Sequence, residues 1–463
     1  MAPDLRTYVR AAVALLLAGA AGCTGVDGTP GAAGARDPYF PRLGNGGYDV
    51  RHYGLTLDYD PATRRLTGRA EITAEATQDL SAFNLDLAGM SVRGATVDGE
   101  RATVRRSGRE LTLRPRGELK SGSTFRAVVD YAGVPERITD ADGSHEGWLP
   151  TPDGALGVGE PTGSAAWFPG NHHPSDKAAY DVEVTVPEGL TAVSNGTLKS
   201  TTTRAGRTTF SWHSPEPMAS YLALMAIGKY DVRTGRSPGG VPYYTAVDPA
   251  VAKDADVESV RADLPGVVDW AVENFGPYPF SGAGAVVEPG EVLEYALETQ
   301  TKPVFPVGAF DELTLVHEIA HQWFGNSVSP RDWRDMWLNE SFATYAEWMY
   351  DEDFDDVPVE DAFQEEYDSD ANWAFSPAKP PTAADVSEPP VYGRGAMVLH
   401  KVREAVGDDV FFEVLKGWPA AFRHGNASTA DFTAYVEETA DEDLSEVWDV
   451  WLYGEGRPKS PDA

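Results

Sequence analysis

Cysteine is almost absent from this chain of 463 residues, which contains a single one, Cys23. The chain therefore cannot form an internal disulfide, and any metal ion in the fold must be bound by histidine and carboxylate groups. Basic residues are also scarce, because 38 Lys and Arg stand against 72 Asp and Glu and give a formal net charge of −34. A negative field of this strength repels polyanions, so we expect no nucleic-acid partner.

Long apolar runs are lacking as well. The run near the N-terminus covers only residues 11–18, which is too short to span a bilayer as a permanent helix. Arg6 and Arg10 precede it and small residues follow, which is the pattern of an export signal. We predict that residues 1–22 are this signal.

Cys23 follows three small residues at the end of that signal, an arrangement typical of bacterial lipoproteins. We expect the protein to be exported and lipid-anchored to the outer face of the bacterial cell membrane, touching the membrane only through this lipid. Cleavage to a secreted form stays open. The residues that follow are rich in Gly, Ala and Pro, so residues 23–44 are predicted to form the lipid anchor and a flexible tether.

Short strands dominate residues 45–235. Apolar residues alternate with polar or small ones in several runs, such as Tyr53, Leu55, Leu57 and Tyr59. Asp98 and Gly99 between two such runs are a strong hairpin signal. Many short strands at this spacing predict an antiparallel β-sandwich domain.

The remainder of the chain is predicted to be a mainly helical domain, residues 236–457, which begins in a Gly- and Pro-rich cluster. Within it, His317 and His321 lie four residues apart in a stretch with helical periodicity. Four residues make just over one turn, so both imidazoles project from one face of the helix. This face can offer two nitrogen ligands to one metal ion, and the geometry suits zinc.

Three glutamates complete the predicted zinc centre. Glu318 lies one residue round from the first histidine, so it can act as a base without binding the metal. In the longer form of this motif a histidine at position 327 would be the third metal ligand, but this position is Ser327. The third ligand is therefore assigned to Glu340 in the next helical run. Glu347 is seven residues further along the same face, where it can accept a hydrogen bond from a metal-binding histidine. We predict one Zn²⁺ per chain.

The order of these residues resembles the aminopeptidase N family of zinc exopeptidases, peptidase family M1 of the gluzincins. Its signature is His-Glu-x-x-His, eighteen residues and then Glu, and it is matched here at His317, Glu318, His321 and Glu340. Residues 295–299, 391–396 and 160–177 resemble three further segments of that family. The resemblance extends over about residues 45–457 and implies a thermolysin-like catalytic domain in the helical part.

The resemblance also implies roles for other residues. Glu298 and Glu160 would bind the free amino group of the substrate, and Tyr392 would stabilise the transition state together with the catalytic base Glu318. The implied activity is removal of the N-terminal residue from peptides at or outside the cell surface. The implied partners are peptides with a free N-terminus. In this chain Tyr295 and Thr299 replace the Gly and Asn of the family's segment, so contacts there are expected to differ.

Two alternatives stay open at the level of the sequence. The same zinc centre would serve an endopeptidase. A catalytically inactive, surface-tethered peptide-binding module would need neither the base nor the tyrosine.

Overall fold

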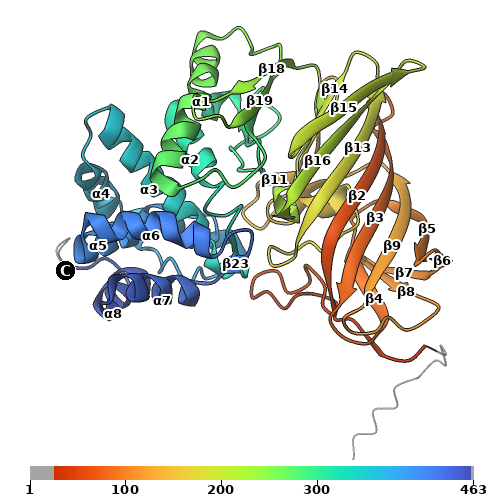
Figure 1. Cartoon of the computed structure of the whole chain (residues 1–463), viewed down its shortest axis with the longest axis horizontal. Coiled ribbons are helices and arrows are strands. Elements are labelled where there is room, and N and C mark those ends of the chain that lie inside the picture. Colours follow the sequence, from red (N-terminus) through yellow and green to blue (C-terminus); the bar gives the residue numbers. More distant parts are fainter. Residues whose placement is uncertain (1–25, 460–463) are drawn as a thin grey trace, which may run out of the picture.

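The computed structural model describes residues 26–459, which form two parts lying side by side (Figure 1). Strands make up most of residues 29–228, whereas the α-helices of the described chain all lie between residues 255 and 447. The predicted class, a β-rich domain followed by a mainly helical one, is confirmed.

The largest sheet has eight strands in the order β15-β16-β13-β2-β3-β9-β5-β6. Neighbours are antiparallel except β13 and β2, which run parallel. Alternate residues of β2 are buried, as the sequence pattern predicts, because one face of the sheet packs on the core. The strands are β2 (Tyr48–Asp60), β3 (Arg65–Ala76), β5 (Ser91–Val97), β6 (Glu100–Arg101), β9 (Thr124–Gly133), β13 (Lys177–Pro187), β15 (Thr197–Arg204) and β16 (Arg207–Ala219).

Two smaller sheets complete the first part. One has the order β1-β4-β8-β7 and the other the order β10-β11-β12-β17-β14. The hairpin of β10 and β11 forms one edge of the second sheet. The strands are β1 (Thr29–Pro30), β4 (Leu80–Asp86), β7 (Thr103–Ser107), β8 (Glu110–Arg114), β10 (Arg137–Thr139), β11 (His145–Pro150), β12 (Ala155–Val158), β14 (Thr191–Ser194) and β17 (Met225–Gly228).

The second part opens with a four-stranded sheet, in the order β18 (Asp231–Arg236), β19 (Pro242–Val247), β20 (Ala283–Glu288) and β21 (Val304–Pro306). β18 and β19 form a hairpin whose turn is the Gly- and Pro-rich cluster. The predicted boundary after residue 235 therefore falls inside this hairpin. The same turn residues mark hairpins and linkers, so composition alone does not distinguish them.

Helices form the rest of the second part. α2 and α3 pack against each other, and α1 and α5 flank them. A short parallel pair, β22 (Ser329–Pro330) and β23 (Asn426–Ala427), joins distant segments. No helix among residues 26–459 is long and apolar enough to cross a membrane. The helices are α1 (Ala255–Phe275), α2 (Glu312–Ala320), α3 (Trp337–Phe354), α4 (Val359–Asp368), α5 (Gly395–Val406), α6 (Asp408–Ala421), α7 (Thr429–Ala440) and α8 (Ser445–Val447).

The segment before β2 corrects one prediction, because residues 29–44 do not form a flexible tether. β1 pairs with β4, and the buried Asp37 accepts a hydrogen bond from the backbone N–H of Trp333 at 2.9 Å. The Tyr39 hydroxyl donates to the carbonyl of Pro380 at 2.6 Å. A composition rich in Gly, Ala and Pro predicted flexibility, but a few side chains fix the segment to both parts.

A half-buried lysine also links the two parts. Lys177 of β13 donates to the backbone carbonyls of Asn326, Ser327 and Gly425 at 2.9, 2.9 and 3.1 Å. Two of these carbonyls lie in the turn that follows α2. The β-rich part therefore holds the turn that directly follows the two histidines.

Candidate metal centre and adjoining pocket

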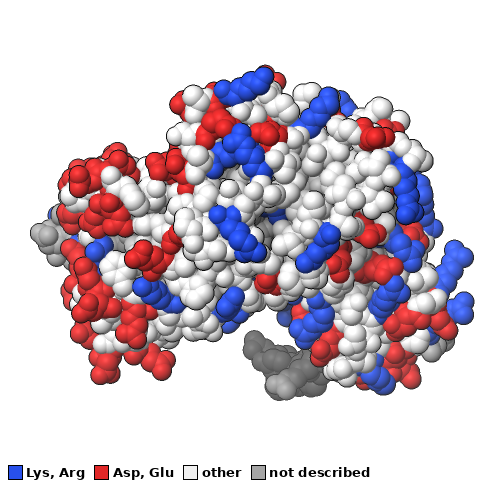
Figure 2. Space-filling view, turned by 45° about the horizontal axis from the view of Figure 1, so that its top comes forward, with Lys and Arg blue, Asp and Glu red and all other residues white. Residues whose placement is uncertain are grey.

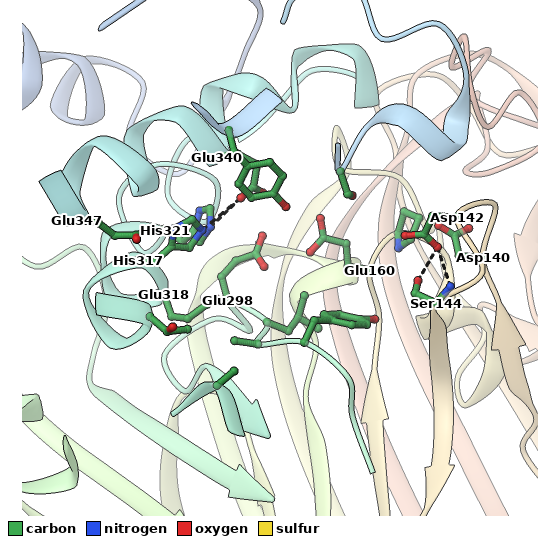
Figure 3. Close-up of a pocket in the computed structure, with 18 residues that line it drawn as sticks. Asp140, Asp142, Ser144, Glu160, Glu298, His317, Glu318, His321, Glu340 and Glu347 are labelled. Atoms are coloured by element: carbon green, nitrogen blue, oxygen red, sulfur yellow. Dashed lines mark hydrogen bonds and ion pairs between the residues drawn. The ribbon is translucent and has the colours of Figure 1, made fainter. Parts of the chain in front are cut away.

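A cavity of about 400 Å³ lies between the two parts, and it brings together the residues predicted from the sequence (Figure 3). One wall comes from the hairpin β10–β11 and the segment after β12. The opposite wall comes from α2, α3 and the π-helical turn Pro390–Arg394. The cavity therefore needs both parts of the chain.

His317 of α2 and His321, the residue that follows the end of α2, meet Glu340 of α3 in this cavity. Asp311 precedes α2, and its side chain accepts a hydrogen bond from the N–H of Thr314 at 2.9 Å and caps the helix. The Nε2 atoms of His317 and His321 lie 3.3 and 3.4 Å from Oε2 of Glu340. Ligand atoms around a tetrahedral zinc ion with bonds of about 2.1 Å are about 3.4 Å apart. The three side chains therefore fit one zinc ion.

Neighbouring groups orient both imidazoles. Nδ1 of His317 lies 2.5 Å from Oε1 of Glu347, and Nδ1 of His321 lies 3.0 Å from the carbonyl oxygen of Phe324. Each contact places the proton on Nδ1 and leaves Nε2 free for a metal. Burial opposes ionisation of Glu340, but the two imidazoles outweigh it and lower its pKa to about 2, so this ligand is a carboxylate.

Glu318 lies beside these ligands. Its side chain is buried, and its Oε2 atom has no hydrogen-bond partner among the described residues. Burial raises the pKa of Glu318 to about 8, although the two imidazoles lower it. A buried carboxylate of this kind accepts a proton more readily than an exposed one.

Glu298 and Glu160 lie beside the metal ligands in the cavity (Figure 3). Carboxylate oxygens of both residues and of Glu340 lie within 4.8 Å of one another. Burial raises the pKa of Glu160 and of Glu298, and in Glu160 the charge of Glu298 adds to this effect. Two adjacent carboxylates with this little exposure to solvent favour a cationic ligand.

The backbone of Glu298 is held by polar residues that the sequence did not single out. Asn326 and Gln322 donate side-chain hydrogen bonds to its carbonyl at 2.7 and 3.3 Å. Both follow the histidine motif directly, so the chain that carries the metal ligands also positions Glu298. Their place just after that motif is the only sequence signal that points to them.

Glu146 of β11 positions the segment that carries Glu160. Its carboxylate accepts hydrogen bonds from Thr162 N at 3.0 Å, from Thr162 Oγ1 at 2.6 Å and from Gly163 N at 2.9 Å. Glu146 is fully buried. No motif marked it, because its partners are sixteen or more residues away and meet it only in the folded chain.

Tyr392 completes the pocket. Its ring stacks on that of His317, with centroids 6.2 Å apart. Arg394, in the same turn, donates to the carbonyls of Trp451 and Phe375 at 3.0 Å each and fixes the backbone. Burial raises the pKa of Tyr392 well above its ordinary value, so the hydroxyl keeps its proton.

The structure thus brings the predicted residues together, and their individual roles stay predictions. Cys23 lies outside the described residues.

Comparisons with known proteins agree with this geometry. The model of the peptidase family M1 domain matches residues 311–451, and that of the peptidase M1 N-terminal domain matches residues 155–222. The chain belongs to peptidase family M1. An M1 zinc metallopeptidase mutant from Deinococcus radiodurans bound to a Tyr-Ser-Ala substrate has a TM-score of 0.86 and 29% identity. The aligned region covers 93% of this chain and 100% of the Deinococcus chain.

Curated M1 relatives are longer. Aminopeptidase N of Streptomyces lividans is 26% identical over 438 residues, which are 87% of this chain and 50% of that protein. The tricorn protease-interacting factor F2 of Thermoplasma acidophilum is 26% identical and is covered to 40%. The chain thus spans about half or less of these relatives. The predicted family, the two-domain M1 fold and the zinc cofactor are confirmed.

Proposed function

We propose that this M1 chain is a zinc aminopeptidase that hydrolyses the first peptide bond of peptides. The observation that carries the proposal is the pair of the half-buried Glu160 and the buried Glu298, whose carboxylates lie next to the metal ligand Glu340 in one cavity. A pair of this kind binds the ammonium group of a free N-terminus and so places the first peptide bond beside the metal centre.

The chain's own residues account for the reaction. Zinc held by His317, His321 and Glu340 would supply a Lewis acid that makes water more acidic and polarises the scissile carbonyl. Glu318 takes a proton from the attacking water and delivers it to the nitrogen of the leaving amine. The C–N bond breaks, and the products are a free amino acid and a peptide one residue shorter.

Tyr392 stabilises the transition state in this proposal. Its hydroxyl stays protonated and lies in the cavity wall near the metal ligands. It can donate a hydrogen bond to the oxygen on which negative charge develops, and such a donor contributes about 3 kcal/mol.

Cleavage of a peptide with a free N-terminus and of the same peptide N-acetylated tests the proposal. Acetylation removes the ammonium charge, so the wild type should cleave only the free peptide, and Glu298→Ala should reduce this preference. Similar rates on both peptides would instead favour a zinc endopeptidase. Binding of the peptide with stoichiometric zinc and no cleavage would favour an inactive peptide-binding module.

The cellular location is a further part of the proposal. Arg6, Arg10 and the apolar run before the only cysteine support export and attachment of lipid at Cys23, at the outer face of a bacterial membrane. Fatty-acid labelling of the wild type and of Cys23→Ala checks this. Labelling of both proteins, or of neither, would reject the lipid anchor. Absence of label from both proteins, together with recovery of the wild type in the medium, would support secretion.

A further inference from the structure

The far end of the pocket carries charges that the proposed reaction does not use. We propose that Asp140 and Asp142 of the hairpin β10–β11, together with Tyr295, receive the side chain of the substrate's first residue and select lysine or arginine. The inference rests on the proposed aminopeptidase function and names its substrate class.

The two aspartates continue the line of the pocket. Figure 3 shows the metal ligands on one side of Glu160 and Asp140, Asp142 and Ser144 on the other side. All of these residues line the same cavity. A substrate whose ammonium group contacts Glu160 has its reacting bond toward the metal ligands, so its first side chain has room on the side of the aspartates.

Asp142 is held in a fixed orientation. Its Oδ1 atom accepts hydrogen bonds from the backbone N–H and the hydroxyl of Ser144, at 2.8 and 2.7 Å. The other carboxylate oxygen is left for a ligand. Arg109, a basic side chain near Asp140, donates to Thr162 and does not line the cavity.

Tyr295 lines the same cavity as Asp140 and Asp142 and offers an aromatic ring there. Its hydroxyl donates to the carbonyl of His145 in the hairpin at 3.3 Å, which attaches the ring to the hairpin that carries the aspartates. Burial and then the nearby charges of Glu146, Glu160, Asp142 and Asp140 raise the pKa of Tyr295. An aromatic face beside carboxylates suits a guanidinium or ammonium group, which gains both cation–π and ionic contacts.

The charge of the cavity points to the same class of ligand. Seven carboxylate side chains line it, and its described lining contains no Lys or Arg. Glu298 is only 3% exposed, and its Oε1 atom is buried with no hydrogen-bond partner among the described residues. Zinc and one ammonium group neutralise only part of this charge. Figure 2 shows acidic side chains gathered over the helical part as well, which would attract cationic peptides.

Arginine and citrulline substrates test this selection, because the two side chains have nearly the same shape and differ in charge. The measurement is the ratio of kcat/KM for the two 4-nitroanilides. We expect the wild type to favour arginine by about 100-fold, since two charge-assisted contacts of about tenfold each are lost with citrulline. Asp140→Asn and Asp142→Asn should each lower the ratio about tenfold, and the double variant should bring it near one.

Glu413→Gln is the matched control, because it removes the same charge from an exposed position on α6 outside the cavity lining. It should leave the ratio unchanged. A wild-type ratio near one, or a double variant that keeps the wild-type ratio, would overturn the inference. Failure to cleave either substrate, or equal cleavage of N-acetylated arginine 4-nitroanilide, would instead refute the aminopeptidase function itself.

Discussion

Replacement of Glu146 by glutamine tests how the fold positions Glu160, the proposed ammonium-binding group. The carboxylate accepts three hydrogen bonds from Thr162 and Gly163 in a fully buried place. An amide has one oxygen instead of two, and its NH₂ group would face an N–H donor. At least one donor loses its acceptor, at a cost of about 1–3 kcal/mol. Movement of the segment that carries Glu160 relieves this cost.

The expected loss follows from the contact that Glu160 would make. A charge-assisted contact with the ammonium group contributes about 1.5–3 kcal/mol, so kcat/KM should fall about 10- to 150-fold in Glu146→Gln. This contact exists in the ground state and in the transition state, so KM should rise more than kcat falls. Steady-state kinetics on a 4-nitroanilide substrate, with zinc content measured in parallel, give both numbers.

A double-mutant cycle with Glu160→Gln decides whether Glu146 acts through Glu160. If it does, the double variant should lose no more activity than Glu160→Gln alone. Additive losses would refute the positioning role, as would an unchanged KM with reduced stability only. Glu288→Gln is a matched control, since Glu288 is equally buried but binds Tyr230 outside the cavity.

Four further predictions concern the metal centre and the β-rich part. His321→Ala should lose bound zinc, measured by metal analysis, because two ligands cannot complete a tetrahedral site; retained stoichiometric zinc would contradict the ligand assignment. Glu318→Gln should keep zinc and lose about 10²-fold or more in kcat, and near-normal turnover would rule it out as the base. Tyr392→Phe should lower kcat by about 10²-fold with little change in KM, and the reverse pattern would assign it to ground-state binding. Burial lowers the pKa of His172 to about 4, so the folded protein binds fewer protons than the unfolded chain between pH 4 and about 6.5. As the pH is lowered through this range, the free energy of unfolding should therefore fall by up to about 3 kcal/mol more in the wild type than in His172→Gln. Urea unfolding of both proteins at several pH values measures this difference, and an equal fall in both would refute the prediction.

The metal centre could be predicted from the sequence because its geometry is mostly local. His317 and His321 are one helical turn apart, and Glu340 and Glu347 share a face of the next helix. Spacing alone therefore implied that the members of each pair point in the same direction. Glu160 and Glu298 could be named only through a family resemblance. Nothing local indicates that they meet.

Other parts of the site depend on long-range contacts. Asp140 and Asp142 resemble any acidic turn until the hairpin β10–β11 is placed opposite Tyr295. The boundary near residue 235 was misplaced because β18 pairs with a strand beyond the turn rather than with the first part. Sequence patterns report local conformation, and these features are properties of the assembled chain.

The attachment of residues 29–44 to the fold limits how far a lipid-anchored form of the protein could lie from the membrane. Thr29 in β1 is only the sixth residue after Cys23, and six fully extended residues span about 20 Å. If Cys23 carries lipid, the sheet that contains β1 stays within that distance of the bilayer. This short linker would then restrict rotation of the protein. The orientation of the protein relative to the membrane would determine the direction from which peptides reach the pocket.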